Sequence, residues 1–152
     1  MAVREEVIGM LRADHEQVKA LFAAYEAAPD WSARWLIAER AFTALEIHSE
    51  LEAMVFYPAF DRHTTKRGSA WVEDSIHDHG CMVALIEQMQ DMASDDPRFP
   101  ATFQELMDLV EGHIAEEETT MFPAAEAARL DQDEELWVAM QELKQELLLS
   151  AP

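Results

Sequence analysis

The sequence has one cysteine, few basic residues and no long apolar run, and each shortage argues against a class of protein. Cys81 lacks a second cysteine for an internal disulfide, which fits a reducing cytoplasm. No segment approaches the ~20 consecutive apolar residues that cross a bilayer, so we expect no membrane span. Arg4, Glu5 and Glu6 stand where a signal peptide requires apolar residues, so we expect a cytoplasmic protein.

Lysine and arginine together number only 11, against 31 aspartate and glutamate residues, giving a formal charge of −20. This balance argues against nucleic acid as a partner, because phosphate groups require a basic surface. We interpret the acidic surface mainly as a source of solubility. Attraction of cations towards a metal site is a secondary benefit.

Strand-like alternation is also missing, whereas apolar residues recur at the three- and four-residue spacing of helices. At 152 residues the chain is long enough for one domain, 1–152, with its own core. The predicted fold is all-α: an up-down-up-down antiparallel four-helix bundle over residues 3–127, followed by an additional C-terminal helix at 131–149. We interpret the last helix as a cover for one side of the bundle, with a surface for a helical partner as the alternative.

One pattern, E-x-H-x-x-x-E-x-x-x-x-x-P, occurs twice, at 46–58 and at 111–123. Residues four apart lie on the same side of a helix, so each histidine and its glutamate can ligate the same or adjacent metal ions. The proline is expected where each helix stops or bends.

A second pattern, D-H-x-x-x-x-A-L, begins at Asp14 and again at Asp78. His15 and His79 are 64 residues apart, and His48 and His113 are 65 apart. The near-equal spacings predict two related helical hairpins, so that each of the four bundle helices contributes one histidine.

Each histidine falls on a stripe that is otherwise apolar. On the third helix, predicted over 70–92, this stripe is Val72, Ile76, His79, Val83 and Ile86. Two helices also place a glutamate on the buried side, where an unpaired carboxylate costs several kcal/mol. A pair of divalent cations resolves that conflict, with iron as the first choice and manganese and zinc as competitors. The candidate metal ligands are His15, His48, Glu52, His79, His113 and Glu117.

Several neighbouring residues are less easily assigned. Helical phase turns His77 away from the stripe that contains His79, and the same reasoning predicts solvated side chains for Glu46, Glu50 and Glu111, with His63 in a polar loop. Glu116 and Glu118 flank Glu117, and only the match to Glu52 favours Glu117 as the ligand. Tyr57 has two interpretations, as a donor of a hydrogen bond or an electron near the site or as a packing residue. Gly80 and Gly112 either make room beside the metals or are tolerated accidents.

The chain resembles the hemerythrin-like, HHE cation-binding domains over about residues 5–125. The resemblance rests on Asp14-His15-Glu16, His48-x-x-x-Glu52 with Phe56-Tyr57-Pro58, Asp78-His79, and His113-x-x-x-Glu117 with Phe122-Pro123. It implies a non-haem centre of two iron ions, oxo- or hydroxo-bridged, in an antiparallel bundle. Glu52 and Glu117 would bridge the ions, and the four histidines would be terminal ligands.

Two positions differ from the oxygen-carrying hemerythrins that this family includes. Val83 stands where the carriers have a second histidine on the third helix, and Glu118 stands where they have an aspartate. We interpret the missing histidine as leaving an open position on one iron. The remaining set looks more like bacterial HHE proteins linked to nitric oxide and peroxide, and like iron-sensing hemerythrin domains.

The predicted function is therefore that of a di-iron protein that binds or reacts with peroxide, nitric oxide or oxygen, as a redox enzyme or a protective scavenger. The alternative is a carrier or sensor of oxygen, nitric oxide or iron without turnover. A third interpretation is a bundle whose metal is structural.

Overall fold

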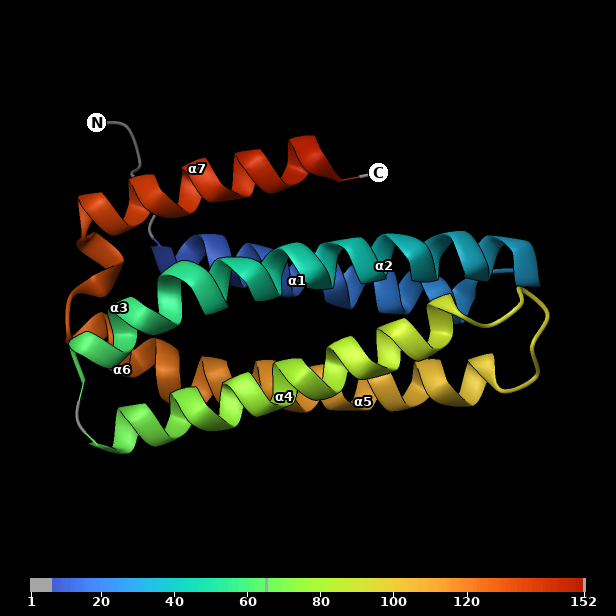
Figure 1. Ribbon diagram of the computed structural model, residues 1–152, viewed down its shortest axis with the longest axis horizontal. Helices are drawn as coiled ribbons and strands as arrows, with labels where there is room; N and C mark the ends of the chain where they lie inside the picture. Colours follow the sequence, from blue (N-terminus) through green and yellow to red (C-terminus); the bar gives the residue numbers. More distant parts are fainter. Residues whose placement is uncertain (1–6, 65, 152) are drawn as a thin grey trace.

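Four long helical rods run antiparallel, and a further helix lies alongside them (Figure 1). The computed structural model describes residues 7–64 and 66–151. The first rod is α1 (Val7–Ala27), and the third is α4 (Lys66–Gln90). The second rod consists of α2 (Trp31–Leu51), the π-helical turn η1 (Glu52–Phe56) and α3 (Tyr57–Arg62). The fourth rod consists of α5 (Phe99–Glu116), the π-helical turn η2 (Glu117–Met121) and α6 (Phe122–Ala127). The short 3-10 turn η3 (Leu130–Gln132) and α7 (Glu134–Ser150) complete the chain. The predicted all-α bundle with an additional C-terminal helix is confirmed, and residues 3–6 of its first predicted helix lie outside the described residues.

Aspartate side chains begin two of these helices. Asp30 caps α2 by accepting a hydrogen bond of 2.8 Å from the backbone N–H of Ala33, as predicted. Asp133 caps α7 by accepting one of 3.1 Å from Leu136, two residues later than the predicted start at Asp131. The polar loop predicted at 61–69 is much shorter, because α3 continues to Arg62 and α4 already begins at Lys66.

The repeated motif contains a π-helical turn in both copies, η1 and η2, immediately before each proline. Pro58 and Pro123 then lie in the first turn of α3 and α6, directly after the π-helical turns. Neither helix therefore ends at its proline. Single π turns are rare in proteins and often lie at functional sites.

The predicted inward face of α4 is wrong in part. Ile76 is 54% exposed and Val83 is 41% exposed, although both were placed on the buried stripe with His79. The buried positions on either side of His79 are instead Ser75 and Met82. The neighbours of His79 at −3 and +4, Ile76 and Val83, thus face outward, and those at −4 and +3, Ser75 and Met82, face the bundle interior.

The interior consists of two apolar clusters with a polar layer between them. One cluster surrounds Phe99 and Phe103 at the end where α1 joins α2 and α4 joins α5. The other surrounds Phe56, Phe60 and Phe122 at the opposite end. All six candidate ligands come from the intervening stretch of each rod and are buried. The bundle therefore holds its polar residues away from both ends.

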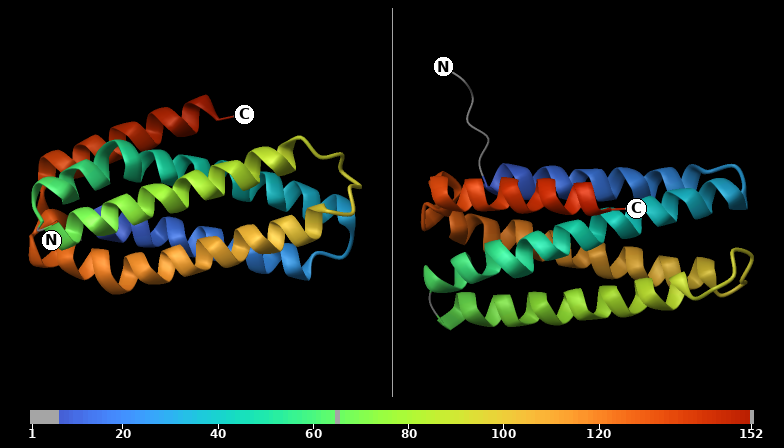
Figure 2. Two further views of the ribbon diagram at one scale, coloured as in Figure 1. Left: turned by 60° about the horizontal axis from the view of Figure 1, so that its bottom comes forward. Right: turned by 45° about the horizontal axis from the view of Figure 1, so that its top comes forward.

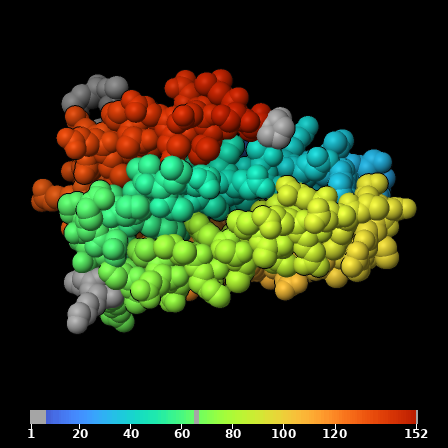
Figure 3. All heavy atoms as spheres, viewed as in Figure 1, coloured from blue at the N-terminus to red at the C-terminus, as the bar shows by residue number. Residues whose placement is uncertain are grey.

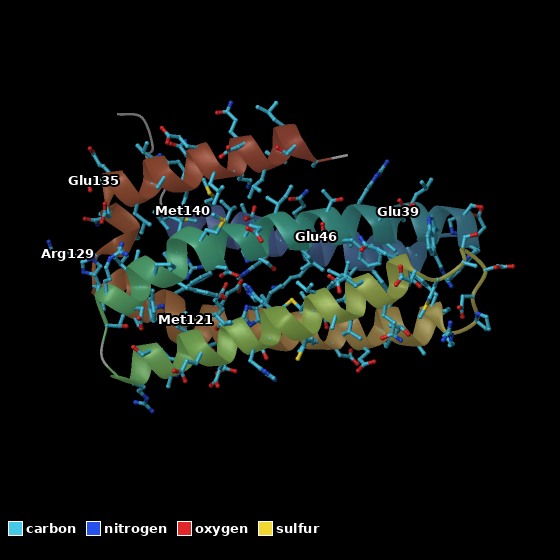
Figure 4. All side chains as sticks on the ribbon, in the orientation of Figure 1. Glu39, Glu46, Met121, Arg129, Glu135 and Met140 are labelled. Carbon is cyan, nitrogen blue, oxygen red and sulfur yellow. The ribbon has the colours of Figure 1, made fainter. Side chains whose placement is uncertain are left out.

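Helix α7 packs beside α1 and α2 and ends partway along the bundle, as the rotated and space-filling views show (Figures 2 and 3). Its buried residues, Leu136 and Met140, join the apolar cluster of Phe56 and Phe122. Figure 4 shows Met140 pointing from α7 towards the bundle. Over the described residues, no helix is long and apolar enough to cross a membrane.

Candidate metal centre

The six predicted ligand residues lie together in the polar layer, with their ring nitrogens and carboxylate oxygens directed at one another. Within each repeated motif, His48 Nε2 lies 3.0 Å from Glu52 Oε1, and His113 Nε2 lies 3.3 Å from Glu117 Oε2. Between the hairpins, His15 Nε2 lies 3.0 Å from Glu117 Oε1, and His79 Nε2 lies 3.2 Å from Glu52 Oε1. Each glutamate therefore faces histidines of both hairpins.

The convergent atoms form two overlapping groups. In one, single ligand atoms of His15, His48, Glu52 and Glu117 all lie within 4.8 Å of one another. In the other, those of Glu52, His79 and His113 do so. Glu52 belongs to both groups, and Glu117 also lies close to His113. Two cations held side by side would share carboxylates in such an arrangement.

Many of these atoms are buried without a hydrogen bond. Among the described residues, none is formed by His15 Nε2, His48 Nε2, Glu117 Oε1 or either carboxylate oxygen of Glu52. These atoms approach one another to about hydrogen-bond distance, but the donor–acceptor angles are not those of hydrogen bonds. The atoms are directed towards common centres and not towards one another. Buried polar atoms left in this way are costly, and divalent cations at those centres would satisfy them. The donor set fits iron, with manganese or zinc as competitors.

Each repeated Asp-His pair performs two tasks. The histidine faces the centre, while the preceding aspartate binds the outer nitrogen of the histidine on the next rod. Asp14 Oδ2 accepts a hydrogen bond of 3.0 Å from His48 Nδ1, and Asp78 Oδ2 accepts one of 3.1 Å from His113 Nδ1. Carboxylates of this kind fix the tautomer and orientation of metal-binding imidazoles. The Asp-His repeat is visible in the sequence, but the repeat alone predicts no role for its aspartates.

Two further contacts support the His15–His48 side of the cluster. Glu118 Oε1 lies 3.2 Å from His15 Nδ1, on the outer side of that ring, so Glu118 belongs to neither group of convergent ligand atoms. Lys144 Nζ of α7 donates a hydrogen bond of 2.6 Å to Asp14 Oδ1. The additional helix is thus connected to the cluster through one aspartate.

Tyr57 lies in the cluster, in agreement with the first of its two interpretations, that of a hydrogen-bond donor near the site. Its hydroxyl donates a hydrogen bond of 2.7 Å to Glu117 Oε2. The same oxygen lies 3.2 Å from His79 Nε2 and 3.4 Å from His113 Nε2. In the second copy of the motif the equivalent residue is Phe122, which stacks on His15 at a centroid distance of 5.4 Å. Tyr57 is therefore a polar neighbour of only one half of the cluster.

The buried charges shift the proton affinities of these groups strongly. Burial lowers the pKa of His48, but the negative charges of Glu52 and Glu117, the hydrogen bond to Asp14 and the close approach of the Glu52 carboxylate outweigh it and raise that pKa to about 10. Burial likewise opposes protonation of His113, yet the nearby carboxylates of Glu117 and Glu52, with their negative charges, raise its pKa to about 11. Burial and the charges of the same two glutamates raise the pKa of the Tyr57 hydroxyl well above 10.0. Protonated imidazoles thus balance the carboxylates when no metal is bound.

A small enclosed cavity adjoins the histidines on the side of the first apolar cluster. It has a volume of about 10 Å³, and its apolar wall includes Val18, Leu45, Met82 and Val110. This volume accommodates the centre of about one water-sized molecule. Val83 is not part of the wall, because it lies in a surface hollow with Glu87 and Leu147. Val83 thus faces the surface, and the open position on one iron stays a prediction.

The residues predicted to lie outside the centre do so. His77 is exposed, and its Nε2 lies 3.7 Å from Cys81 Sγ. Glu46, Glu50, Glu111 and His63 are exposed as well. Glu116, which the sequence left as an alternative ligand to Glu117, is also exposed. Gly80 and Gly112 are also exposed, and an added Cβ at either would meet nothing within 4 Å, so they do not make room beside the centre.

Comparison with known proteins agrees with this arrangement. The family model of the hemerythrin HHE cation binding domain matches residues 6–125. An uncharacterized hemerythrin-like protein of Schizosaccharomyces pombe is 26% identical over 126 residues, which are 83% of this chain and 62% of that protein. A DNA nickase of Nostoc is 26% identical over 128 residues, which are 84% of this chain and 36% of the nickase. The chain thus spans less than two thirds of either relative. No solved structure matches it significantly.

Proposed function

This chain belongs to the hemerythrin HHE cation-binding domain family, and from that premise we propose that it holds two iron ions and binds or reacts with peroxide, nitric oxide or oxygen. His15, His48, Glu52, His79, His113 and Glu117 would be the ligands. A bound pair of iron ions supplies redox chemistry and an exchangeable position for a small ligand.

The observation that carries this proposal is the convergence of buried, unbonded ligand atoms on two overlapping groups. A single tetrahedral zinc ion takes four ligands, fewer than the six residues gathered in the cluster. Two carboxylates that face histidines of both hairpins support a pair of ions that shares its ligands. Imidazole with carboxylate is a ligand set that suits iron.

The surroundings restrict what can react. The apolar wall of Val18, Leu45 and Val110 and the cavity of about 10 Å³ favour a molecule of two or three atoms over a bulky substrate. Tyr57 places a hydroxyl between Glu117 and two histidines, where it can donate its one hydrogen bond to a ligand at the centre if it releases Glu117. The chain's own residues thus exclude large molecules and supply one buried donor.

A carrier or sensor is the second candidate, and the enclosure of the site favours it. A buried centre with an apolar wall also suits binding without turnover, since it keeps out water and larger reactants. The activity of the nickase relative is not part of the proposal, because the shared region is 36% of that protein and this chain carries a charge of −20. The proposal includes a cytoplasmic setting, which is consistent with a single cysteine.

The test is anaerobic loading with ferrous iron, followed by separate additions of hydrogen peroxide, nitric oxide and oxygen. We expect about two iron ions per chain by the ligand count. An enzyme consumes many equivalents of peroxide or nitric oxide per site, whereas a carrier saturates at one. One tightly bound zinc ion, with no second ion under any loading, would defeat the dinuclear proposal.

Two neighbouring histidines provide a matched pair of variants for this test. His79→Ala removes a buried imidazole of the cluster, so we expect reduced iron content. His77→Ala removes an exposed imidazole of the same helix, so iron content should equal that of the parent. The reverse result would show that His79 is not a ligand.

A further inference from the structure

The two hairpins support their second histidines in the same way but their first histidines differently. His48 and His113 each donate from Nδ1 to an aspartate, Asp14 and Asp78 respectively. His15 Nδ1 contacts the Glu118 carboxylate at 3.2 Å. His79 Nδ1, its counterpart, is buried and has no hydrogen-bond partner anywhere in residues 7–64 and 66–151.

The sequence explains this difference. Glu118 is the second residue of η2, directly after the candidate ligand Glu117. Ala53 is the second residue of η1, directly after Glu52, and so occupies the same place in the first copy of the motif. A methyl group cannot bind an imidazole nitrogen. The carboxylate that supports His15 therefore has no equivalent for His79.

Tyr57 adds a second difference between the halves. Its hydroxyl contacts the Nε2 atoms of His79 and His113, and it donates to the Glu117 oxygen that faces His113. An ion that enters this half must compete with that hydroxyl. Phe122, the equivalent residue beside His15, has no polar atom to compete.

The ligand groups themselves are also unequal. Four ligand atoms converge in the group of His15 and His48, whereas three converge in the group of His79 and His113. Loss of an outer hydrogen bond to a metal-binding imidazole commonly costs 10- to 100-fold in metal affinity. The three differences act in the same direction.

We infer that the two metal positions differ in affinity. The His15–His48 position fills first, and the His79–His113 position holds the more exchangeable ion. Glu118 is the positioning residue that creates much of this difference in affinity. This inference rests on the proposed function, because it requires two bound ions. The inference goes further than the proposed function because it identifies the more exchangeable ion and the residue outside the ligand set that causes the difference in affinity.

The experiment is an anaerobic titration of the metal-free protein with ferrous iron, with binding followed by calorimetry. The parent should show two steps. Glu118→Ala should raise the dissociation constant of the first step about 10- to 100-fold and leave the second nearly unchanged. Ala53→Glu should tighten the second step, because it offers His79 the carboxylate that His15 already has. Glu116→Ala is the matched control, since Glu116 is exposed and belongs to neither group of convergent ligand atoms among the described residues.

The outcomes separate the inference from the proposed function. If the parent binds no second ion, the proposed function fails. If two ions bind with equal affinity, or if Glu118→Ala weakens both steps alike, the inference fails and the di-iron proposal stands. Helical circular dichroism of each variant reports its folding. Should Glu118→Ala not fold, Ala53→Glu decides the question alone: an unchanged second step would refute the role given to the carboxylate.

Discussion

At the scale of single residues, the centre depends on pairs in which one side chain orients another. Asp14 is held between His48 and Lys144, and those two contacts outweigh burial and lower the pKa of its carboxyl group. Asp14 thus stays ionised and can keep the Nδ1 proton of His48 directed outward. The Nε2 atom is then free to face the centre, which is the tautomer that a metal requires.

Glu52 provides the sharpest single-residue prediction. It is fully buried, both its carboxylate oxygens lack hydrogen bonds to the described residues, and it belongs to both ligand groups. We expect Glu52→Gln to lose most of both ions, because the neutral amide cannot balance two cations. Glu50→Gln, an exposed neighbour two residues away, should bind as the parent does. Iron content per chain is the measurement, and equal content in both variants would remove Glu52 from the ligand set.

Helical phase predicted which side chains would gather here, but not the partners behind them. His15, His48, Glu52, His79, His113 and Glu117 follow from residues spaced four apart and from a repeat. The contacts of Asp14, Glu118 and Tyr57 join different rods and depend on how those rods are rotated and spaced. A one-dimensional pattern contains the phase of each helix but no distance between helices.

At the scale of the elements, α4 shows where such a pattern is ambiguous. Residues at −4 and +4 from His79 are Ser75 and Val83, and those at −3 and +3 are Ile76 and Met82. Hydrophobicity alone favours Ile76 and Val83 as buried, yet the helix turns Ser75 and Met82 inward. Ser75 is accommodated because its hydroxyl donates to Met121 Sδ at 3.4 Å. The π turns were equally unforeseen, because neither motif copy has a residue that requires one.

The helices also contain glycines that the fold does not need. Gly80 and Gly112 lie inside α4 and α5, and an alanine Cβ at either would meet nothing within 4 Å. We expect Gly80→Ala and Gly112→Ala each to raise the free energy of unfolding by about 0.5–1 kcal/mol without changing metal content. Urea denaturation of the metal-free protein measures this. Gly68→Ala is the contrasting variant, because its Cβ would collide with the Thr64 side chain. If Gly68→Ala raised the free energy of unfolding as much as Gly80→Ala and Gly112→Ala do, the packing argument would be contradicted.

At the scale of the whole molecule, the bundle places four imidazoles and two carboxylates where neither end of the rods gives access to water. Apolar clusters lie on both sides of this layer, and α7 adds Leu136 and Met140 to one of them. Such burial leaves the metal-free protein with charges that only protons can balance. Folding and metal binding are therefore linked through the protonation of the histidines.

This linkage predicts how the stability of the metal-free protein depends on pH. The pKa of His48 is raised to about 10 and that of His113 to about 11, from about 6.5 in an unfolded chain. Between pH 6.5 and those values the folded state binds more protons than the unfolded state. Their contribution to stability is therefore complete below about pH 6.5 and is lost as the pH rises towards 10 and 11.

We expect the free energy of unfolding of the metal-free protein, measured by urea denaturation, to fall steadily from pH 6 to pH 9.5. The iron-loaded protein, kept anaerobic, should lose much less over the same range, because its histidines bind metal in place of protons. It is the appropriate control, since repulsion among the surface carboxylates of a chain with a charge of −20 acts in both forms. The metal affinity should rise with pH in the same interval, because each bound ion must displace protons from His48 and His113. If the metal-free protein were equally stable at pH 6 and pH 9.5, the imidazoles would not be the counter-charges of Glu52 and Glu117.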